Sequence, residues 1–283
     1  MTVIRYDDPA DFWRTAGDWL EQDPVRNTIA ITVLRQLLEL GPAAGDEPPL
    51  LLTVHDNDVL VGAAIQTPPR PLIVAALPRE THHQVIDVLG EIAGVTGPRD
   101  LADAFTEALL GKTRQLIAAT VPTRLYELGG LTLPQVSGYF RLGTTEDLPV
   151  AARWWDEFAA ELDHFEVGGS GEENARRALD FDRAIGLWFD NDEPVAMAVA
   201  SPAIAGMSRI GPVYTPPAAR GRGYAKAATA HVAQHARDKG AEHVLLFADT
   251  DNPVSNAVYQ GIGFHVVTDA VEYTFVERNT LEP

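Results

Sequence analysis

Cysteine is absent from all 283 residues of the sequence. This absence excludes disulfide bonds, thiolate metal sites and cysteine nucleophiles. No run of about eighteen uncharged apolar residues occurs either, so no membrane-spanning helix is expected. The opening stretch MTVIRYDDPADFW carries acids and an early proline in place of the basic flank and apolar core of a secretory signal. We therefore expect a cytoplasmic protein with no membrane partner.

Positive charge is scarce, with 22 Lys and Arg against 40 Asp and Glu, and the net charge is −18. A chain this acidic repels nucleic acid and anionic membrane surfaces in general, so no nucleic-acid partner is expected. The balance suits a cationic ligand such as an amine. Solubility alone is the plainer explanation of an acidic surface, and both remain open.

Two common nucleotide-binding signatures are also missing. The pattern G-x-G-x-x-G does not occur, and the only Gly-Lys-Thr, at Gly111–Thr113, lacks the earlier glycine of a Walker loop. His231 and His235 are four apart on a predicted helix, as metal ligands can be. No glutamate of an HExxH motif accompanies them, so we expect packing or solvated roles and no metal.

Apolar alternation and chain breakers predict two halves that each mix helices and strands, an α+β fold. Each half contains a hairpin with an Asp-Asn-Asp turn, and the stretches HDNDVLVGAAIQTP and FDNDEPVAMAVASP lie 134 positions apart. We interpret the match as a duplication, with chance as the alternative because such turns are common. The boundary falls in residues 131–138, which gives domains 1–137 and 138–283.

The stretch PVYTPPAARGRGYA, residues 212–225, leads from a strand-like run into an alanine-rich helical pattern. A helix N-terminus presents free N–H groups and partial positive charge, and glycines let the backbone approach a ligand. Together they form an anion site. Arg220, Arg222 and Lys226 add cations in an otherwise acidic chain. A surface turn with solvated arginines is the alternative interpretation of this stretch alone.

The run Arg220-Gly221-Arg222-Gly223-Tyr224-Ala225 resembles the acyl-CoA-binding signature of the GNAT superfamily of acetyltransferases, Arg/Gln-x-x-Gly-x-Gly/Ala. A second stretch, DTDNPVSNAVYQGIGF at 249–264, is similar to that family's second cofactor segment, with Asn252, Ser255 and Tyr259 in its places. The resemblance is specific over residues 205–268 and plausible over 139–278.

The resemblance implies that the loop N–H groups hold the CoA pyrophosphate, and that the preceding strand splays from its neighbour in a V shape. It implies acetyl-CoA as co-substrate and Tyr259 as the general acid that protonates the departing thiolate. The implied cofactor-binding residues are Val213, Thr215, Arg220, Gly221, Arg222, Gly223, Tyr224, Ala225, Asn252 and Asn256.

The implied reaction transfers an acetyl or other acyl group to a primary amine, small molecule or peptide, by direct attack in a ternary complex. An N–H near Val213 would polarise the carbonyl. Glu166 is the candidate base, in a segment that also holds Asp163 and His164, and a water relay is the alternative. A non-catalytic acyl-CoA sensor or structural module is the rival hypothesis, and the chain could be a monomer or a homodimer.

The first half lacks the equipment of the second. Its third predicted strand runs into LPRETHHQVIDVL, which has no glycine where the anion loop would be. We therefore expect a degenerate GNAT-like domain that has lost CoA binding, in tandem with a catalytic one.

Overall fold

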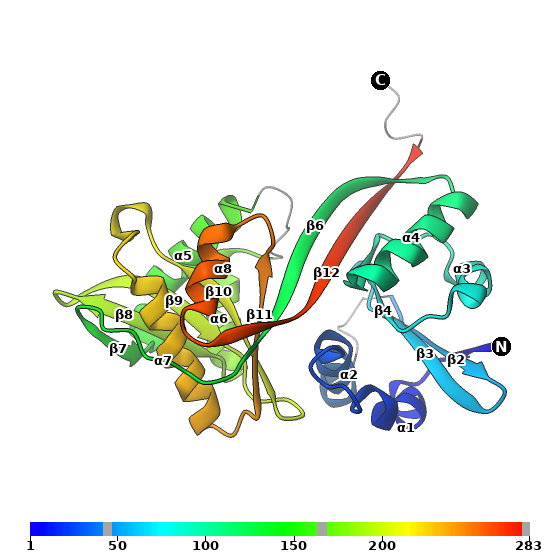
Figure 1. The fold of residues 1–283 in the computed structure, drawn as a ribbon, viewed down its shortest axis with the longest axis horizontal. Coiled ribbons are helices and arrows are strands. Elements are labelled where there is room, and N and C mark those ends of the chain that lie inside the picture. Colours follow the sequence, from blue (N-terminus) through cyan, green and yellow to red (C-terminus); the bar gives the residue numbers. More distant parts are fainter. Residues whose placement is uncertain (42–46, 163–168, 279–283) are drawn as a thin grey trace. The chain divides into compact units, whose positions relative to one another are not determined.

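The structure, a computed structural model, describes residues 1–41, 47–162 and 169–278 (Figure 1). Contacts divide the chain into two compact units: unit 1 comprises Met1–Thr123 and Thr268–Pro283, and unit 2 comprises Arg124–Val267. Each unit mixes helices with strands, so the expected α+β class is confirmed. Among the described residues, no helix has the length and apolar character needed to cross a bilayer.

Unit 1 is a sheet covered by four helices. Its helices are α1 (Pro9–Leu20), α2 (Thr28–Leu40), α3 (His82–Leu89) and α4 (Arg99–Lys112). Its strands are β1 (Thr2–Tyr6), β2 (Leu50–Asp56), β3 (Val59–Gln66), β4 (Leu72–Ala75) and β5 (Gly94–Pro98), with parts of β6 (Gln115–Leu128) and β12 (Phe264–Glu277). Strands β1 to β4 pair antiparallel in sequence order, and β4 pairs with β5 in parallel.

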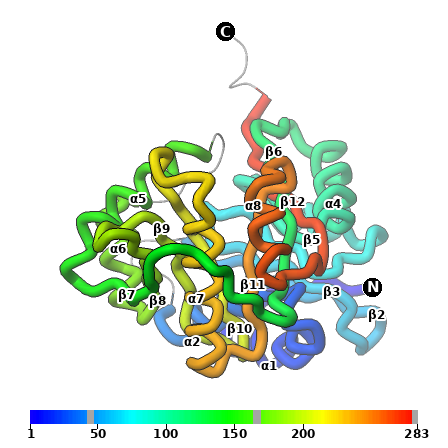
Figure 2. Tube along the Cα trace, turned by 60° about the vertical axis from the view of Figure 1, so that its left-hand side comes forward, coloured from blue at the N-terminus to red at the C-terminus, as the bar shows by residue number. Residues whose placement is uncertain are grey.

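Unit 2 repeats this plan. Its helices are α5 (Leu148–Ala160), α6 (Gly171–Asp180), α7 (Tyr224–Asp238) and α8 (Pro253–Gln260). Its further strands are β7 (Tyr139–Leu142), β8 (Ala184–Asp190), β9 (Glu193–Ala200), β10 (Met207–Tyr214) and β11 (His243–Asp249). One core cluster packs α5 and α6 on one face of the sheet, and another packs α7 and α8 on the opposite face (Figure 2).

The two units share one order of elements: a strand, two helices, three strands, a helix, a strand and a helix. The directions of pairing agree as well, with three antiparallel pairs followed by one parallel pair in each unit. The Asp-Asn-Asp segments form the β2–β3 and β8–β9 turns, where Asn57 and Asn191 have φ of 54° and 51°. This shared topology supports the duplication inferred from the sequence.

Each unit is completed by a strand encoded in the other half of the chain. Strand β12 leaves unit 2 after Val267, and its residues 270–274 pair antiparallel with β5 of unit 1. Strand β6 enters unit 2 at Arg124, lies beside β11, and places Tyr126 in the α7–α8 core.

The compact units therefore differ from the limits 1–137 and 138–283 expected from the sequence. Residues 124–137 lie with unit 2 and residues 268–283 with unit 1. An alternating strand pattern predicts a buried face but does not name the strand's partner. The sequence pattern therefore places each strand with its neighbours along the chain, even where the strand pairs with the other half.

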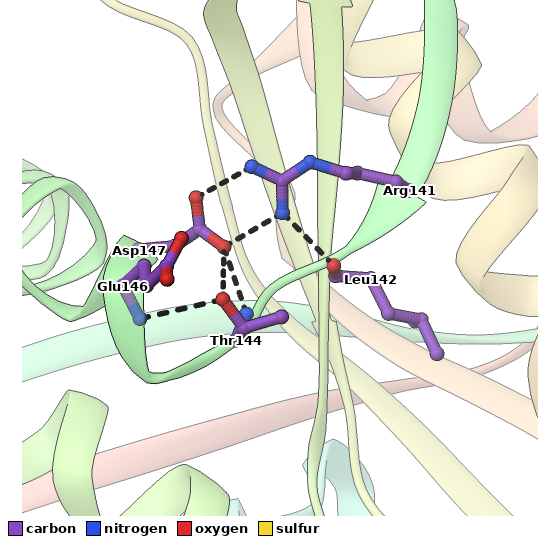
Figure 3. A network of polar contacts seen from close by, with 5 residues as sticks. All are labelled: Arg141, Leu142, Thr144, Glu146 and Asp147. Atoms are coloured by element: carbon purple, nitrogen blue, oxygen red, sulfur yellow. Dashed lines mark hydrogen bonds and ion pairs between the residues drawn. The ribbon is translucent and has the colours of Figure 1, made fainter.

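A polar network ties β7 to the start of α5 (Figure 3). Asp147 accepts hydrogen bonds from Arg141 at 2.7 and 2.8 Å, and from the Thr144 N–H at 2.8 Å. The Arg141 guanidinium also lies 4.4 Å from the centre of the Phe189 ring. The hydrogen bonds from Arg141, more than any other contact, lower the pKa of the Asp147 carboxyl to about 2.

We expect the exchange of strands to decide which fragments fold. Residues 138–283 alone lack β6, so the core of unit 2 loses Tyr126 and Leu128 and the edge of β11 is left open. A fragment of residues 115–267 keeps β6 and should unfold cooperatively in urea, with dispersed amide NMR signals. Cooperative unfolding of the fragment 138–283 would contradict the exchange.

Replacement of Asp147 by Asn should lower the free energy of unfolding at pH 7 by about 2 kcal/mol, the value of a carboxyl pKa lowered from 3.8 to about 2. A carboxyl whose pKa is lowered by folding stabilises the fold at pH values above its pKa in the unfolded chain. This contribution therefore disappears as the pH falls from about 4 to about 2. Urea unfolding at pH 7 and pH 3 measures the difference. The exposed control Asp180→Asn should change stability by less than about 0.5 kcal/mol at both.

Candidate active site

Strands β10 and β11 run in parallel and then part. Their ladder joins residues 207–210 to residues 243–246 and ends there, although β10 continues to Tyr214 and β11 to Asp249. The register of β10 against β9 also shifts between Ile210 and Val213, which marks a bulge. The V-shaped splay expected in unit 2 is therefore present, and it exposes one backbone edge of residues 211–214.

The chain leaves β10 through Pro216 and Pro217 and reaches α7 through the glycine-rich loop. Gly221 and Gly223 have φ of 78° and 84°, a left-handed conformation that favours glycine. Gly223 is the N-cap of α7, and no side chain caps this end of the helix. The N–H groups of its first turn therefore face outward without a capping partner, as an anion site requires.

The cations of the loop have different positions. Arg222 is exposed and forms no ion pair within the described part of the chain. Arg220 pairs with Glu161 at the end of α5, and its Nε donates to the Thr215 carbonyl at 2.9 Å. The Arg220 side chain therefore braces the loop against α5, a contact that the motif gave no signal for.

Two other residues predicted to bind the cofactor differ in the hydrogen bonding of their side chains. The Tyr224 side chain is buried, and its hydroxyl donates to Asp190 at 2.6 Å. Thr215 has a buried Oγ1 without a hydrogen-bond partner among the described residues. Tyr224 can therefore offer a ligand its backbone N–H, whereas Thr215 holds an unsatisfied polar atom beside the loop.

The two asparagines fix the start of α8. Asn252 accepts from the Ser255 N–H at 3.0 Å and so caps the helix. Asn256 donates to the carbonyls of Asp249 and Asn252 at 2.8 and 2.7 Å, and accepts from the Tyr126 hydroxyl at 2.6 Å. Asn252 therefore fixes the start of α8, and Asn256 holds the helix against the end of β11.

Tyr259 lies in the core of unit 2 with a free hydroxyl. It is 9% exposed, and its ring lies 6.4 Å from Tyr126 and 6.2 Å from Phe264, centre to centre. Its hydroxyl has no hydrogen-bond partner among the described residues. Burial raises the pKa of Tyr259 to about 12, so the phenol is protonated at neutral pH.

The candidate base Glu166, together with Asp163 and His164, lies outside the described residues. Sequence reasoning missed an acidic pair on α5, Glu157 and Glu161, whose spacing of four residues was the available signal. Burial, followed by the hydrogen bond with Glu157, raises the pKa of Tyr214 to about 12. The described residues contain no cluster of three or more His, Cys, Asp or Glu suited to a metal.

The predicted packing of His231 agrees with its surroundings. Its ring stacks on Phe140 at 5.4 Å and lies 5.3 Å from Trp188, and burial lowers its pKa.

The equivalent loop of unit 1 is closed. After β4, the Ala76 carbonyl oxygen lies 2.3 Å from where a Cβ on Gly62 would stand, so the chain still lies against β3 at this point. The His82 ring is hydrogen-bonded to the Leu77 carbonyl at 3.2 Å and packs edge-on against Phe105. Side chains therefore fill the region where unit 2 has its glycine-led helix start.

Comparison with known proteins identifies this arrangement. Residues 151–264 match the acetyltransferase (GNAT) family. Residues 151–264 of unit 2 belong to the GNAT acetyltransferase superfamily. The matched segment runs from α5 to the start of β12 and includes the splayed strands, the glycine-rich loop and α8 of the GNAT unit.

One curated relative of this GNAT chain is a mycothiol acetyltransferase from Saccharomonospora viridis, 38% identical over 94 residues. That match covers 32% of this chain and 29% of the relative, so the chain aligns with less than a third of that protein.

Solved structures resemble the fold over both units. A GNAT-family acetyltransferase from Colwellia psychrerythraea has a TM-score of 0.58 at 14% identity, covering 98% of this chain and all of that one. A GCN5-related N-acetyltransferase from Sphaerobacter thermophilus has a TM-score of 0.60 at 17% identity, covering 97% and 95%. A Drosophila protein has a TM-score of 0.65 at 12% identity, covering 96% and 98%. The two-unit GNAT architecture is thus a known fold.

Proposed function

We propose that unit 2 is an N-acetyltransferase that transfers the acetyl group of acetyl-CoA to a primary amine by direct attack in a ternary complex. The observation that carries the proposal is the splay of β10 and β11, which leads to the uncapped, glycine-led start of α7. The acceptor is a small-molecule or peptide amine, and the equivalent loop of unit 1, residues 76–81, contains no glycine.

The residues fit acetyl-CoA from end to end. The first-turn N–H groups of α7, with Gly221 and Gly223, suit the two negative charges of a pyrophosphate, and Arg222 adds a cation. The open edge of residues 211–214 offers backbone donors and acceptors to the amide groups of the pantetheine arm. In this placement the Val213 N–H would polarise the thioester carbonyl.

The chemistry then uses few groups. The neutral amine attacks the carbonyl carbon, a tetrahedral intermediate forms, and its collapse breaks the C–S bond. Tyr259 is proposed as the group that meets the departing sulfur. Because a thiolate of pKa about 8.5 is a weaker base than a phenolate, the Tyr259 hydroxyl acts first as a hydrogen-bond donor to the thiolate. Glu166 or a water relay receives the amine proton.

The rival hypothesis is a sensor that binds acyl-CoA without turnover. The Tyr259 hydroxyl has no hydrogen-bond partner among the described residues, so it is available to the departing sulfur, and a protein that only binds the cofactor has no evident need for it. Thiol release from acetyl-CoA across an amine panel distinguishes the two. Tight CoA binding without thiol release from any amine would refute the enzyme.

Replacement of Gly223 by Ala should weaken CoA binding about tenfold, measured by calorimetry. The left-handed backbone penalises the new side chain by about 1–2 kcal/mol, and its Cβ would lie 3.2 Å from Val136, so the helix start must shift. The matched control is Gly240→Ala after the other end of α7, where φ is 93° and space is open. It should lower the melting temperature similarly and leave CoA affinity unchanged. Equal CoA affinities of the two variants would refute the assignment of the glycine-rich loop to the cofactor site.

Replacement of Tyr259 by Phe should lower kcat at least about a hundredfold at pH 7, while CoA affinity and melting temperature stay the same. With a Tyr259 pKa of about 12, the kcat of the wild-type protein should not fall on the alkaline side below about pH 11. Tyr273→Phe in unit 1 is the control, since that hydroxyl bonds Asp103 instead. An unchanged kcat in Tyr259→Phe would exclude the tyrosine from the mechanism.

A further inference from the structure

Two arginines of unit 2 lie together beside the point where β10 and β11 part. Arg183, just before β8, donates from Nη2 to the Gly211 carbonyl at 2.6 Å. Gly211 is the first residue of β10 beyond the ladder with β11. The Arg183 side chain therefore reaches the apex of the splay.

Arg209 lies on the same face of the sheet. Its neighbour Ile210 packs in the α7–α8 core, and successive side chains of a strand point to opposite faces. Arg209 therefore faces the side covered by α5 and α6. Burial and then the charge of Arg183 lower the pKa of Arg209, and the second of these effects agrees with this placement.

These arginines have no counter-ion within the described part of the chain. Arg183 Nε is buried without a hydrogen-bond partner, and Arg209 is half-buried and makes no ion pair. Burial, above all, lowers the pKa of Arg209 to about 10, and among the described residues the only charges that influence either arginine are other arginines. Other arginines of unit 2, such as Arg141 and Arg220, pair with carboxylates.

An unpaired buried cation is unfavourable in any protein, and especially unexpected in a chain with 40 acidic residues to choose from. The cation–aromatic contact of Arg183 with Trp155, at 5.9 Å, orients the guanidinium without neutralising it. The pair is therefore arranged to receive an anion that the described chain does not supply.

The position relates this anion to the transfer reaction. Val213 follows Gly211 by two residues, or roughly 7 Å along an extended strand. A group held by the arginines would lie within about one amino-acid length of the carbonyl that Val213 polarises. The arginines lie on the face of the sheet covered by α5 and α6, whereas the cofactor loop leads into α7 on the opposite face.

We propose that Arg183 and Arg209 bind a carboxylate of the amine acceptor. The acceptor class is then an amino acid or a similar amine with a nearby carboxylate, which is narrower than the cationic ligand that the net charge suits. This inference rests on the proposed acetyl transfer. Arginine recognises carboxylates by paired, charge-assisted hydrogen bonds. Arg183 and Arg209 would therefore distinguish amines that carry a carboxylate from amines that lack one.

The test uses L-amino acids and, for each, the amine formed by removing its carboxylate. The wild-type protein should show kcat/KM at least tenfold higher for the acids, and Arg209→Gln should reduce that ratio to near one. Arg176→Gln, on the exposed surface of α6, is the matched control and should keep the ratio. Phosphoethanolamine and ethanolamine form a second pair, and a preference for the phosphate alone would overturn the carboxylate assignment, as would equal rates in the main panel.

A binding measurement separates this inference from the proposed function. With CoA present, calorimetry compares N-acetyl amino acids with the corresponding N-alkyl acetamides. The carboxylate-bearing compounds should bind at least tenfold more tightly, and Arg209→Gln should abolish the difference. If no amine is acetylated yet this difference is found, the arginine site stands and the enzyme proposal fails. If wild-type protein binds neither series, or both equally, the arginine site is refuted even where turnover occurs.

Discussion

The end of the β10–β11 ladder is the constraint on which the site of this GNAT chain depends. A sheet normally satisfies its own backbone groups, and a buried N–H or carbonyl without a partner is unfavourable. Here two parallel strands stop pairing after residues 210 and 246, while both continue. The open edge is therefore available to a ligand with alternating amide donors and acceptors, as in the proposed cofactor site. The bulge in β10, the two prolines and the glycine-led helix follow from the need to leave the sheet at that point.

The two units show that topology alone does not create this site. Both have a parallel pair preceded by three antiparallel pairs. In unit 1, however, Ala76 still lies against β3, and buried side chains occupy the start of α3. In unit 2, left-handed glycines keep the helix start accessible. The two units therefore share a topology and differ in a few residues of one loop.

The features set by local chemistry were predictable from the sequence. Glycines before a helix, Asn252 as a cap and the Asp-Asn-Asp hairpins all act through neighbouring backbone groups, and all are found where expected. Features that depend on contacts between residues far apart in the sequence were not predictable. The pairing of Arg220 with Glu161, the closeness of Arg183 and Arg209, and the exchange of β6 and β12 join residues that no sequence spacing relates. The role of Tyr259 lies between these cases, because the motif named the residue but only the fold shows its unpaired hydroxyl.

The exchange of strands has a consequence for synthesis on the ribosome. Domains generally fold in order as they emerge, the N-terminal one first. Unit 1 cannot do so fully, because the partner of its β5 edge is β12, which is among the last segments to be translated. An open strand edge attracts other chains, so the nascent protein carries this exposed edge until translation is nearly complete. The short β5, five residues long and containing Gly94 and Gly97, limits that hazard by offering little edge to a wrong partner.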